Sequence, residues 1–275
     1  MKTAGILFNP MLAPACQFAT DLEPFLKTLG LAVWRSSVWE SEAMRQAIPG
    51  SDLIVTVGGD GTILRAAQAV VPRRIPIVGI NMGKLGFMTE LSPAEAREKL
   101  AALVQGGGWI DERAMLEITV SGEGLVAQEY YALNDVVLAR GAIARIIHVS
   151  ASVDGEPLTT YRADGVVVAT ATGSTGYSMA AGGPILPPGS REFILVPILP
   201  HLGLAYPMVF PDTSGIKLLL ATTHQAIINI DGHINQEVPS GTVVNIRHSA
   251  CRTRFLRVHA RSSFYSTLEQ KLKGK

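Results

Sequence analysis

The chain has 275 residues, enough to bury a large core and to form two domains. Its 24 basic and 23 acidic residues form no long runs of one sign, so nothing marks nucleic acid or an anionic membrane as a partner. The two cysteines, Cys16 and Cys251, are too few for a disulfide scaffold, and no stretch reaches the roughly 20 apolar residues of a membrane helix. We therefore expect a cytoplasmic protein without membrane spans.

The first third of the chain alternates short β-rich runs with helical stretches, which predicts a parallel sheet covered by helices. The expected strands cover residues 5–8, 31–34, 53–57 and 75–80, and apolar residues at helical spacing occupy positions 18–29. Ser92, Pro93 and Glu95 form the start signal of a helix over residues 93–105. Three glycines at 106–108 end it and mark a domain boundary.

Residues 109–260 have a different pattern, with many short β-rich runs and turn pairs such as Ser121-Gly122, Asp154-Gly155 and Asp231-Gly232. We expect an all-β domain of the sandwich type here, interrupted by a helix-like insert at 175–181. Residues 262–272 carry apolar side chains at i, i+4 and i+8, so a C-terminal helix within 261–275 is expected to pack back on the first domain, 1–108.

One glycine-rich turn stands out in the first domain. Gly58, Gly59, Asp60, Gly61 and Thr62 follow an apolar strand and open a helix, so free backbone N–H groups and the helix dipole can bind an anion there. A carboxylate would repel a phosphate unless it faces a metal ion or a hydroxyl proton, and both options indicate phosphoryl transfer. The alternative is a plain strand-to-helix turn in which Asp60 caps the helix.

A second glycine-rich segment, 81–87, follows the next strand and is expected at the same carboxyl edge of the sheet as Asp60. It contains Lys84, a phosphate contact or an ordinary surface lysine, and Phe87, a wall for a ring or a core aromatic.

Two polar segments stand out in the β domain. Asn134 and Asp135 place an amide and a carboxylate side by side within an expected strand, where they suit the edge of adenine and the hydroxyls of ribose, or else form a β-bulge or a polar pair at a strand end. Residues 162–184 combine hydroxyls, small residues and glycines behind a buried valine run. There Tyr177 offers a ring for stacking and Arg162 a charge for a phosphate, although an irregular crossover loop would look similar.

Several motifs are absent. The chain has no Walker-type phosphate loop, no dinucleotide-binding G-x-G-x-x-G with its acidic partner, and no nucleophile elbow around Ser174. Its six histidines lack metal-ligand spacing, so metal ligands stay unknown.

The motifs taken together resemble the NAD kinase family in order and spacing over nearly the whole chain. They lie at 58–64, 81–90, 134–135, 164–165, 172–184, 200–201 and 231–232. The Gly-Gly-Asp-Gly-Thr turn is weakly specific, because diacylglycerol and sphingoid lipid kinases share it, whereas residues 172–184 are much more specific.

The resemblance implies an α/β domain followed by a β-sandwich that binds NAD, and phosphorylation of the 2′-hydroxyl of the adenosine ribose of NAD to give NADP. The implied substrates are NAD and ATP or another polyphosphate, with Mg²⁺ as the divalent metal, in a homodimer or homotetramer.

Asp60 matches the proton acceptor for the 2′-hydroxyl. The implied phosphate loop consists of Gly58, Gly59, Gly61 and Thr62. The implied NAD-binding residues are Asp60, Gly61, Arg65, Asn134, Asp135, Arg145, Arg162, Asp164, Thr172, Thr175, Gly176, Tyr177, Ser178, Ala180 and His233.

The chain departs from the family pattern at several positions. Asp135 stands where glutamate is usual, Gly176 where alanine is usual, Ala171 where proline is usual, and His233 and Tyr206 where glutamine and arginine are common. None removes the proposed base, so these changes bear on substrate preference.

Two other functions use the same features. A lipid kinase would share the Asp60 turn but needs an apolar acceptor site or membrane-facing surface, and no basic amphipathic helix is visible. A non-catalytic NAD(P)-binding sensor would not need Asp60.

Overall fold

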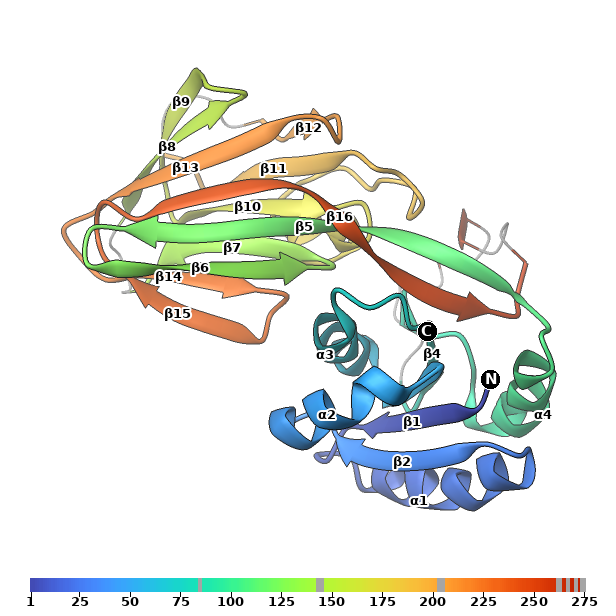
Figure 1. Cartoon of the computed structure of the whole chain (residues 1–275). Helices are drawn as coiled ribbons and strands as arrows, with labels where there is room; N and C mark the ends of the chain where they lie inside the picture. Colours follow the sequence, from blue (N-terminus) through green and yellow to red (C-terminus); the bar gives the residue numbers. More distant parts are fainter. Residues whose placement is uncertain are drawn as a thin grey trace. The chain divides into compact units, whose positions relative to one another are not determined.

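The computed structural model describes residues 1–83, 86–141, 146–201 and 206–260, together with positions 264, 265, 268, 269 and 272 (Figure 1). The chain divides into two compact units. The first unit comprises Met1–Glu112 and Thr253–Lys275, and the second comprises Arg113–Arg252.

The first unit contains the predicted parallel sheet. Its strands lie in the order β2-β1-β3-β4, and the end of β16 follows, where Phe255 pairs in parallel with Ile77. The bounds are β1 (Thr3–Phe8), β2 (Ala32–Ser37), β3 (Leu53–Gly58), β4 (Ile77–Asn81) and β16 (Val243–Arg257). Two strands begin later than predicted, β2 by one residue and β4 by two. Because β1, β2, β3 and β4 pair in parallel, their carboxyl ends share one edge of the sheet.

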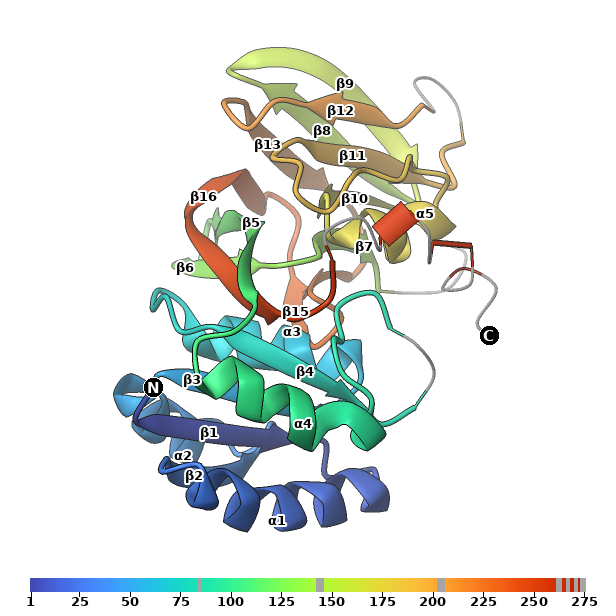
Figure 2. The same cartoon turned by 90° about the vertical axis from the view of Figure 1, so that its right-hand side faces the viewer.

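Helices cover this sheet on both faces (Figure 2). They are α1 (Ala13–Thr28), α2 (Ser41–Ala47), a 3₁₀ turn η1 (Ile48–Gly50), α3 (Asp60–Val70) and α4 (Pro93–Val104). Buried residues of α1 and α4 join Val78 and Ile80 of β4 in one apolar cluster. Gly79, which faces the other way, lies against Ile63 of α3. Successive side chains alternate across a strand, so α3 packs on the face opposite α1 and α4.

The predicted start of α4 is confirmed. The backbone N–H of Ser92 donates to Oε1 of Glu95 at 2.7 Å, and Ser92 and Glu95 form a capping box ahead of Pro93. In contrast, α2 was not predicted from the sequence.

The second unit consists mainly of antiparallel strands, as the predicted fold class requires. One group comprises β5 (Trp109–Gly122), β6 (Leu125–Ala132), β8 (Ile147–Val153), β9 (Glu156–Ala163), β13 (Gly215–Ala221) and the first part of β16. The other sheet has the order β12-β11-β10-β7-β14-β15. Its strands are β7 (Asp135–Arg140), β10 (Gly165–Thr170), β11 (Phe193–Ile198), β12 (Met208–Phe210), β14 (Ala226–Ile230) and β15 (Ile234–Val238).

The β10 strand is buried on both sides. Val166 and Val168 join the apolar cluster that also contains residues of β5, β8 and β13, while Val167 and Ala169 pack in a second cluster that includes Leu186. A strand covered on both faces needs no polar alternation, which explains the valine run.

Two of the three expected turn pairs lie at hairpin turns. Asp154 and Asp231 adopt positive φ angles of 53° and 50°, each followed by a glycine of positive φ. Asp154-Gly155 forms a two-residue turn between β8 and β9, whereas Asp231-Gly232 begins a three-residue loop, 231–233, between β14 and β15. The Ser121-Gly122 pair instead ends β5, and the chain turns at Gly124, which has a φ of 75°.

The helix predicted near the C-terminus falls largely outside the described residues. Among the residues that the structure does describe, no helix has the length and apolar character needed to cross a membrane. Both cysteines are free.

Candidate active site

Asp60 lies where β3 ends and α3 begins, with Gly59 as the N-cap residue of the helix. Because Gly59 and not Asp60 occupies the N-cap position, the capping alternative is wrong. Instead, Oδ2 accepts the backbone N–H of Phe87 at 2.8 Å and Oδ1 accepts that of Met88 at 3.0 Å. A Cβ on Gly86 would overlap this carboxylate. The carboxylate is therefore held by the loop that follows β4.

The glycines of the turn have different roles. A Cβ on Gly58 would overlap the hydroxyl of Thr62, so this position must lack a side chain for the turn to close. A Cβ on Gly59 or Gly61 would meet nothing within 4 Å, and neither residue has a positive φ. Their missing side chains leave the backbone beside Asp60 open to a ligand.

Two more predicted residues of this unit lie on α3. Thr62 is buried with 4% exposure. Arg65 lies one turn further along, and its guanidinium lies 5.9 Å from the centroid of the Trp39 ring. Such a cation–π contact fixes the arginine near the start of the helix.

In the second unit, Asn134 and Asp135 lie at the junction where β6 ends and β7 begins, not within one strand as expected. The carboxylate of Asp231 holds this junction. It accepts backbone N–H groups from Leu133 at 2.9 Å, Asn134 at 2.7 Å and Asp135 at 3.1 Å. Successive amides directed at one carboxylate fix the backbone from which the Asn134 and Asp135 side chains project.

Asp135 and Asp231 are both buried, with 6% and 3% exposure. Burial, with a smaller contribution from the negative charge of Asp231, raises the pKa of Asp135 to about 7. Near neutral pH the Asp135 carboxyl therefore exchanges between a form that only accepts hydrogen bonds and a form that can also donate one.

The segment after β10 packs against this junction. The hydroxyl of Thr170 donates to the carbonyl of Leu133 at 2.6 Å and accepts the N–H of Gly173 at 3.1 Å. A Cβ on Gly173 would overlap the backbone of Asn134, so only glycine allows this approach. The Cβ position of Gly176 lies 3.9 Å from the Asn134 side-chain nitrogen and 3.9 Å from Oδ2 of Asp135. The predicted residues 134, 135 and 176 are thus neighbours, and Gly173 lies beside them.

Two buried polar atoms in this region have no hydrogen-bond partner among the described residues: Oδ1 of Asn134 and Oγ of Ser178. Ser178 lies in the short helix α5 (Tyr177–Ala180), which follows the 3₁₀ turn η2 (Gly173–Thr175). Buried polar atoms normally have partners, so these two suit a bound ligand with its own donors.

The other predicted residues lie as follows. Thr172 is buried, and its hydroxyl accepts from Nη1 of Arg113 at 3.3 Å. Tyr177 is 47% exposed and Ala180 is exposed. Thr175 is half-buried, and its hydroxyl donates to the carbonyl of Thr172 at 3.4 Å.

Three further predicted residues are described. Arg162 is exposed on β9, and Asp164 pairs with Arg140 at 2.9 Å. His233 is half-buried and its Nδ1 lies 3.0 Å from the carbonyl oxygen of Asp231. Arg145 and Lys84 lie outside the described residues.

Sequence reasoning missed the role of Asp231, which it treated as a turn residue. The Asp-Gly pair signals the hairpin turn, but nothing in it shows that the carboxylate faces residues 133–135, about a hundred positions earlier. Thr170 and Arg113 were missed for the same reason.

No group of three or more histidine, cysteine, aspartate or glutamate side chains that could hold a metal occurs in the described part of the chain. A pocket of about 450 Å³ is lined by residues 222–225 and 237–240, none of which was predicted for the site.

A glycine-rich strand-to-helix turn with open backbone amides is typical of proteins that bind phosphorylated ligands. Family models identify the class. The ATP-NAD kinase N-terminal domain matches residues 6–108, and the ATP-NAD kinase C-terminal domain matches residues 133–258. The chain belongs to the NAD kinase family.

Individual relatives agree. The NAD kinase of Dehalococcoides mccartyi (strain CBDB1) is 46% identical over 99% of this chain and 96% of its own length. That of Chloroflexus aggregans is 36% identical over 99% of both chains. These matches give no support to the lipid kinase or to the non-catalytic sensor.

Two solved structures share the fold. An NAD kinase from Archaeoglobus fulgidus in complex with ATP has a TM-score of 0.79 and 29% identity, over 99% of both chains. Yeast NADH kinase complexed with NADH has a TM-score of 0.89 at 21% identity, covering 99% of this chain and 88% of its own.

Proposed function

We propose that the chain transfers a phosphoryl group from ATP or another polyphosphate to the 2′-hydroxyl of the adenosine ribose of NAD, giving NADP. It is then a kinase with an alcohol group as acceptor, as its family membership indicates. The single observation that carries the mechanism is the position of Asp60, whose carboxylate is held by two backbone amides beside open glycine backbone.

In this proposal Asp60 takes the proton of the ribose hydroxyl as the new bond to phosphorus forms. A carboxylate offers about four lone-pair sites, so the amides of Phe87 and Met88 leave room for a hydroxyl. An unactivated alcohol is a poor nucleophile, and a positioned base contributes about 10²–10⁴-fold to such a step. The open amides at Gly59 and Gly61 suit the phosphate charge.

The adenosine part is proposed to bind in the second unit. The unpartnered amide oxygen of Asn134 can accept from the amino group of adenine, and Ser178 supplies a second polar atom. Asp135 faces ribose hydroxyls in this assignment. Thr172, Thr175, Gly176, Tyr177 and Ala180 form the surrounding segment, while Gly61, Arg65, Arg145, Arg162, Asp164 and His233 are proposed as further dinucleotide contacts.

ATP as donor is supported by the ATP complex of the archaeal relative. Magnesium usually binds through one or two carboxylates together with substrate phosphates, so the lack of a three-ligand cluster in the described part is compatible with an ion that arrives with the nucleotide. Bound to the polyphosphate, such an ion would neutralise its charge during transfer.

We also propose a cytoplasmic location, which the free cysteines support, and a homodimer or homotetramer, which the family resemblance implies. Sedimentation of the purified protein tests the number of subunits.

The function is tested by incubating the purified chain with ATP and Mg²⁺ and offering NAD, NADH or diacylglycerol as acceptor in separate reactions. A dehydrogenase specific for NADP detects product from NAD, and labelled ATP detects any phosphorylated lipid. We expect NADP and no labelled lipid. Labelled lipid without NADP would support the lipid kinase, and NAD binding without turnover would support the sensor.

A further inference from the structure

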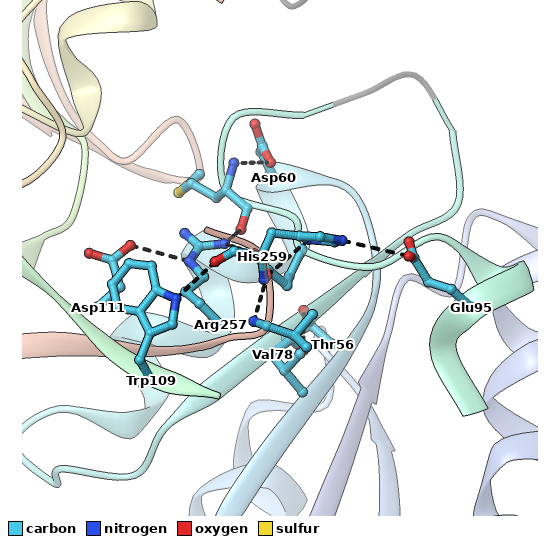
Figure 3. Close-up of polar contacts among 11 residues, drawn as sticks. Thr56, Asp60, Val78, Glu95, Trp109, Asp111, Arg257 and His259 are labelled. Carbon is cyan, nitrogen blue, oxygen red and sulfur yellow. Dashed lines mark hydrogen bonds and ion pairs between the residues drawn. The ribbon is translucent and has the colours of Figure 1, made fainter. Parts of the chain in front are cut away.

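A buried arginine, Arg257, lies beside the loop that holds Asp60 and has no role in the proposed function. It ends β16 and is 6% exposed. Its Nη1 donates to the backbone carbonyl of Met88 at 2.8 Å and to Oε2 of Glu90 at 3.1 Å, and its Nε lies 3.2 Å from Oδ2 of Asp111 (Figure 3). The guanidinium is therefore fixed by acceptors from two separate segments of the chain.

Glu90 fixes the strand end as well as the arginine. Its Oε1 accepts the backbone N–H groups of Val258 and His259, both at 2.7 Å. The Arg257 guanidinium also lies 4.7 Å from the centroid of the Phe255 ring. These contacts leave Arg257 little freedom to move relative to the loop.

Met88 connects Arg257 to Asp60. Its N–H donates to Oδ1 of Asp60 at 3.0 Å, and its carbonyl accepts from Arg257. Two residues further on, the backbone N–H of Glu90 donates to the carbonyl of Gly79 at 2.9 Å, which ties the loop to β4. The Asp60 carboxylate is thus directed by a loop whose backbone is held on the other side by Arg257.

We propose that Arg257 is a positioning residue for phosphoryl transfer, acting through Met88 to orient the carboxylate of Asp60. This inference rests on the proposed role of Asp60. A shift of about 1 Å in a reacting group can lower turnover about 10²-fold without loss of substrate binding. The substrate itself is not touched by Arg257 in this scheme.

The geometry requires arginine. Its planar fork reaches Met88 and Glu90 with one nitrogen and Asp111 with another. A lysine carries the same charge on one nitrogen and cannot span these acceptors in the same way. Arg257→Lys therefore removes the fixed set of hydrogen bonds to the loop while it keeps the positive charge.

The test compares Arg257→Lys with a matched control, Arg254→Lys, on the same strand. Arg254 pairs with Glu112 at 2.8 Å, and no described contact of Arg254 involves the loop. We expect Arg257→Lys to lower kcat about 10–100-fold with KM for NAD within about threefold, and Arg254→Lys to match wild type. Backbone hydrogen exchange at Phe87 and Met88 is expected to become faster in Arg257→Lys only.

A folded Arg257→Lys enzyme with kcat within about twofold of wild type would overturn the proposal. So would a fall in kcat without faster exchange at Phe87 and Met88, since that would indicate a different cause. If Arg257→Lys does not fold, the double variant Arg257→Gln/Asp111→Asn removes one charge of each sign and is judged by the same criteria. If neither wild type nor Arg254→Lys forms NADP, the proposed function itself fails, while the exchange rates still report whether Arg257 holds the loop.

Discussion

A carboxylate at the first residue of a helix commonly interacts with its own helix, whereas that of Asp60 turns to the loop after β4. The hydrogen bonds from Phe87 and Met88 account for this direction. The sequence predicts that Asp60 stands at a phosphate-type turn, because glycines and a buried strand surround it. It cannot predict which way the side chain points, because its partners lie 27 and 28 positions further along.

We expect Asp60→Asn to keep the fold and much of the NAD affinity while lowering kcat about 10²–10⁴-fold, because the amide cannot take the ribose proton. Steady-state kinetics and NAD titration measure the two effects. The substituted amide also has only one acceptor oxygen for the two N–H groups of the loop, so the substitution weakens the contact between residue 60 and the loop. Arg257→Lys serves as the control, because it loosens the loop while it keeps the carboxylate of Asp60. Turnover of Asp60→Asn near the wild-type value would remove Asp60 from its role.

The buried Asp135 predicts a pH-dependent stability. Its folded pKa of about 7 lies above the ordinary value of 3.8, so the folded protein binds this proton more tightly than the unfolded chain does. The contribution of this proton to the free energy of unfolding is fully present below about pH 4 and is lost as the pH rises through about 7. Asp135→Asn, which carries no charge, should therefore have a higher Tm than wild type at pH 8, and the difference should shrink toward pH 5.

Thermal unfolding between pH 5 and pH 8 measures this difference, and Asp21→Asn, at an exposed position of α1, is the control. A Tm gap between Asp135→Asn and wild type that stays constant over this range would contradict the assignment.

At the scale of elements, α4 was predictable because its start signal is local. Ser92, Pro93 and Glu95 lie within four residues, and the capping box they predict is present. The Asn134-Asp135 junction was misplaced within a strand because Asp231 and Thr170, which hold it, are distant in the sequence. The need for glycine at position 173 could not be predicted either, since it arises only from the packing of Gly173 against Asn134.

The capping box gives a stability prediction. Ser92→Ala should lower the free energy of unfolding by about 1 kcal/mol, the usual cost of losing an N-cap side chain. Glu98→Ala on the same helix is the control, because the Glu98 side chain is 78% exposed and its change should cost less than about 0.5 kcal/mol. Urea denaturation followed by circular dichroism measures both. Equal effects of the two substitutions would show that the capping box does not stabilise α4.

At the scale of the whole chain, the change from alternating helices and strands to β-hairpins predicts two different units, and both are present. The family was recognisable because its motifs occur in order over nearly the full length of the chain, and the family models and relatives confirm the family. The parts that escaped prediction, Asp231 and Arg257, join residues about a hundred or more positions apart. Such contacts exist only once the chain has folded, so no local pattern marks them.

The position of the transferred phosphate tests the central proposal most directly. Purified protein is given labelled ATP and either NAD or the analogue that lacks the 2′-hydroxyl on its adenosine ribose, and the dinucleotide products are separated by chromatography. The account predicts label in the product from NAD and none in the 2′-deoxy analogue. Label in the 2′-deoxy analogue at a comparable rate would contradict it.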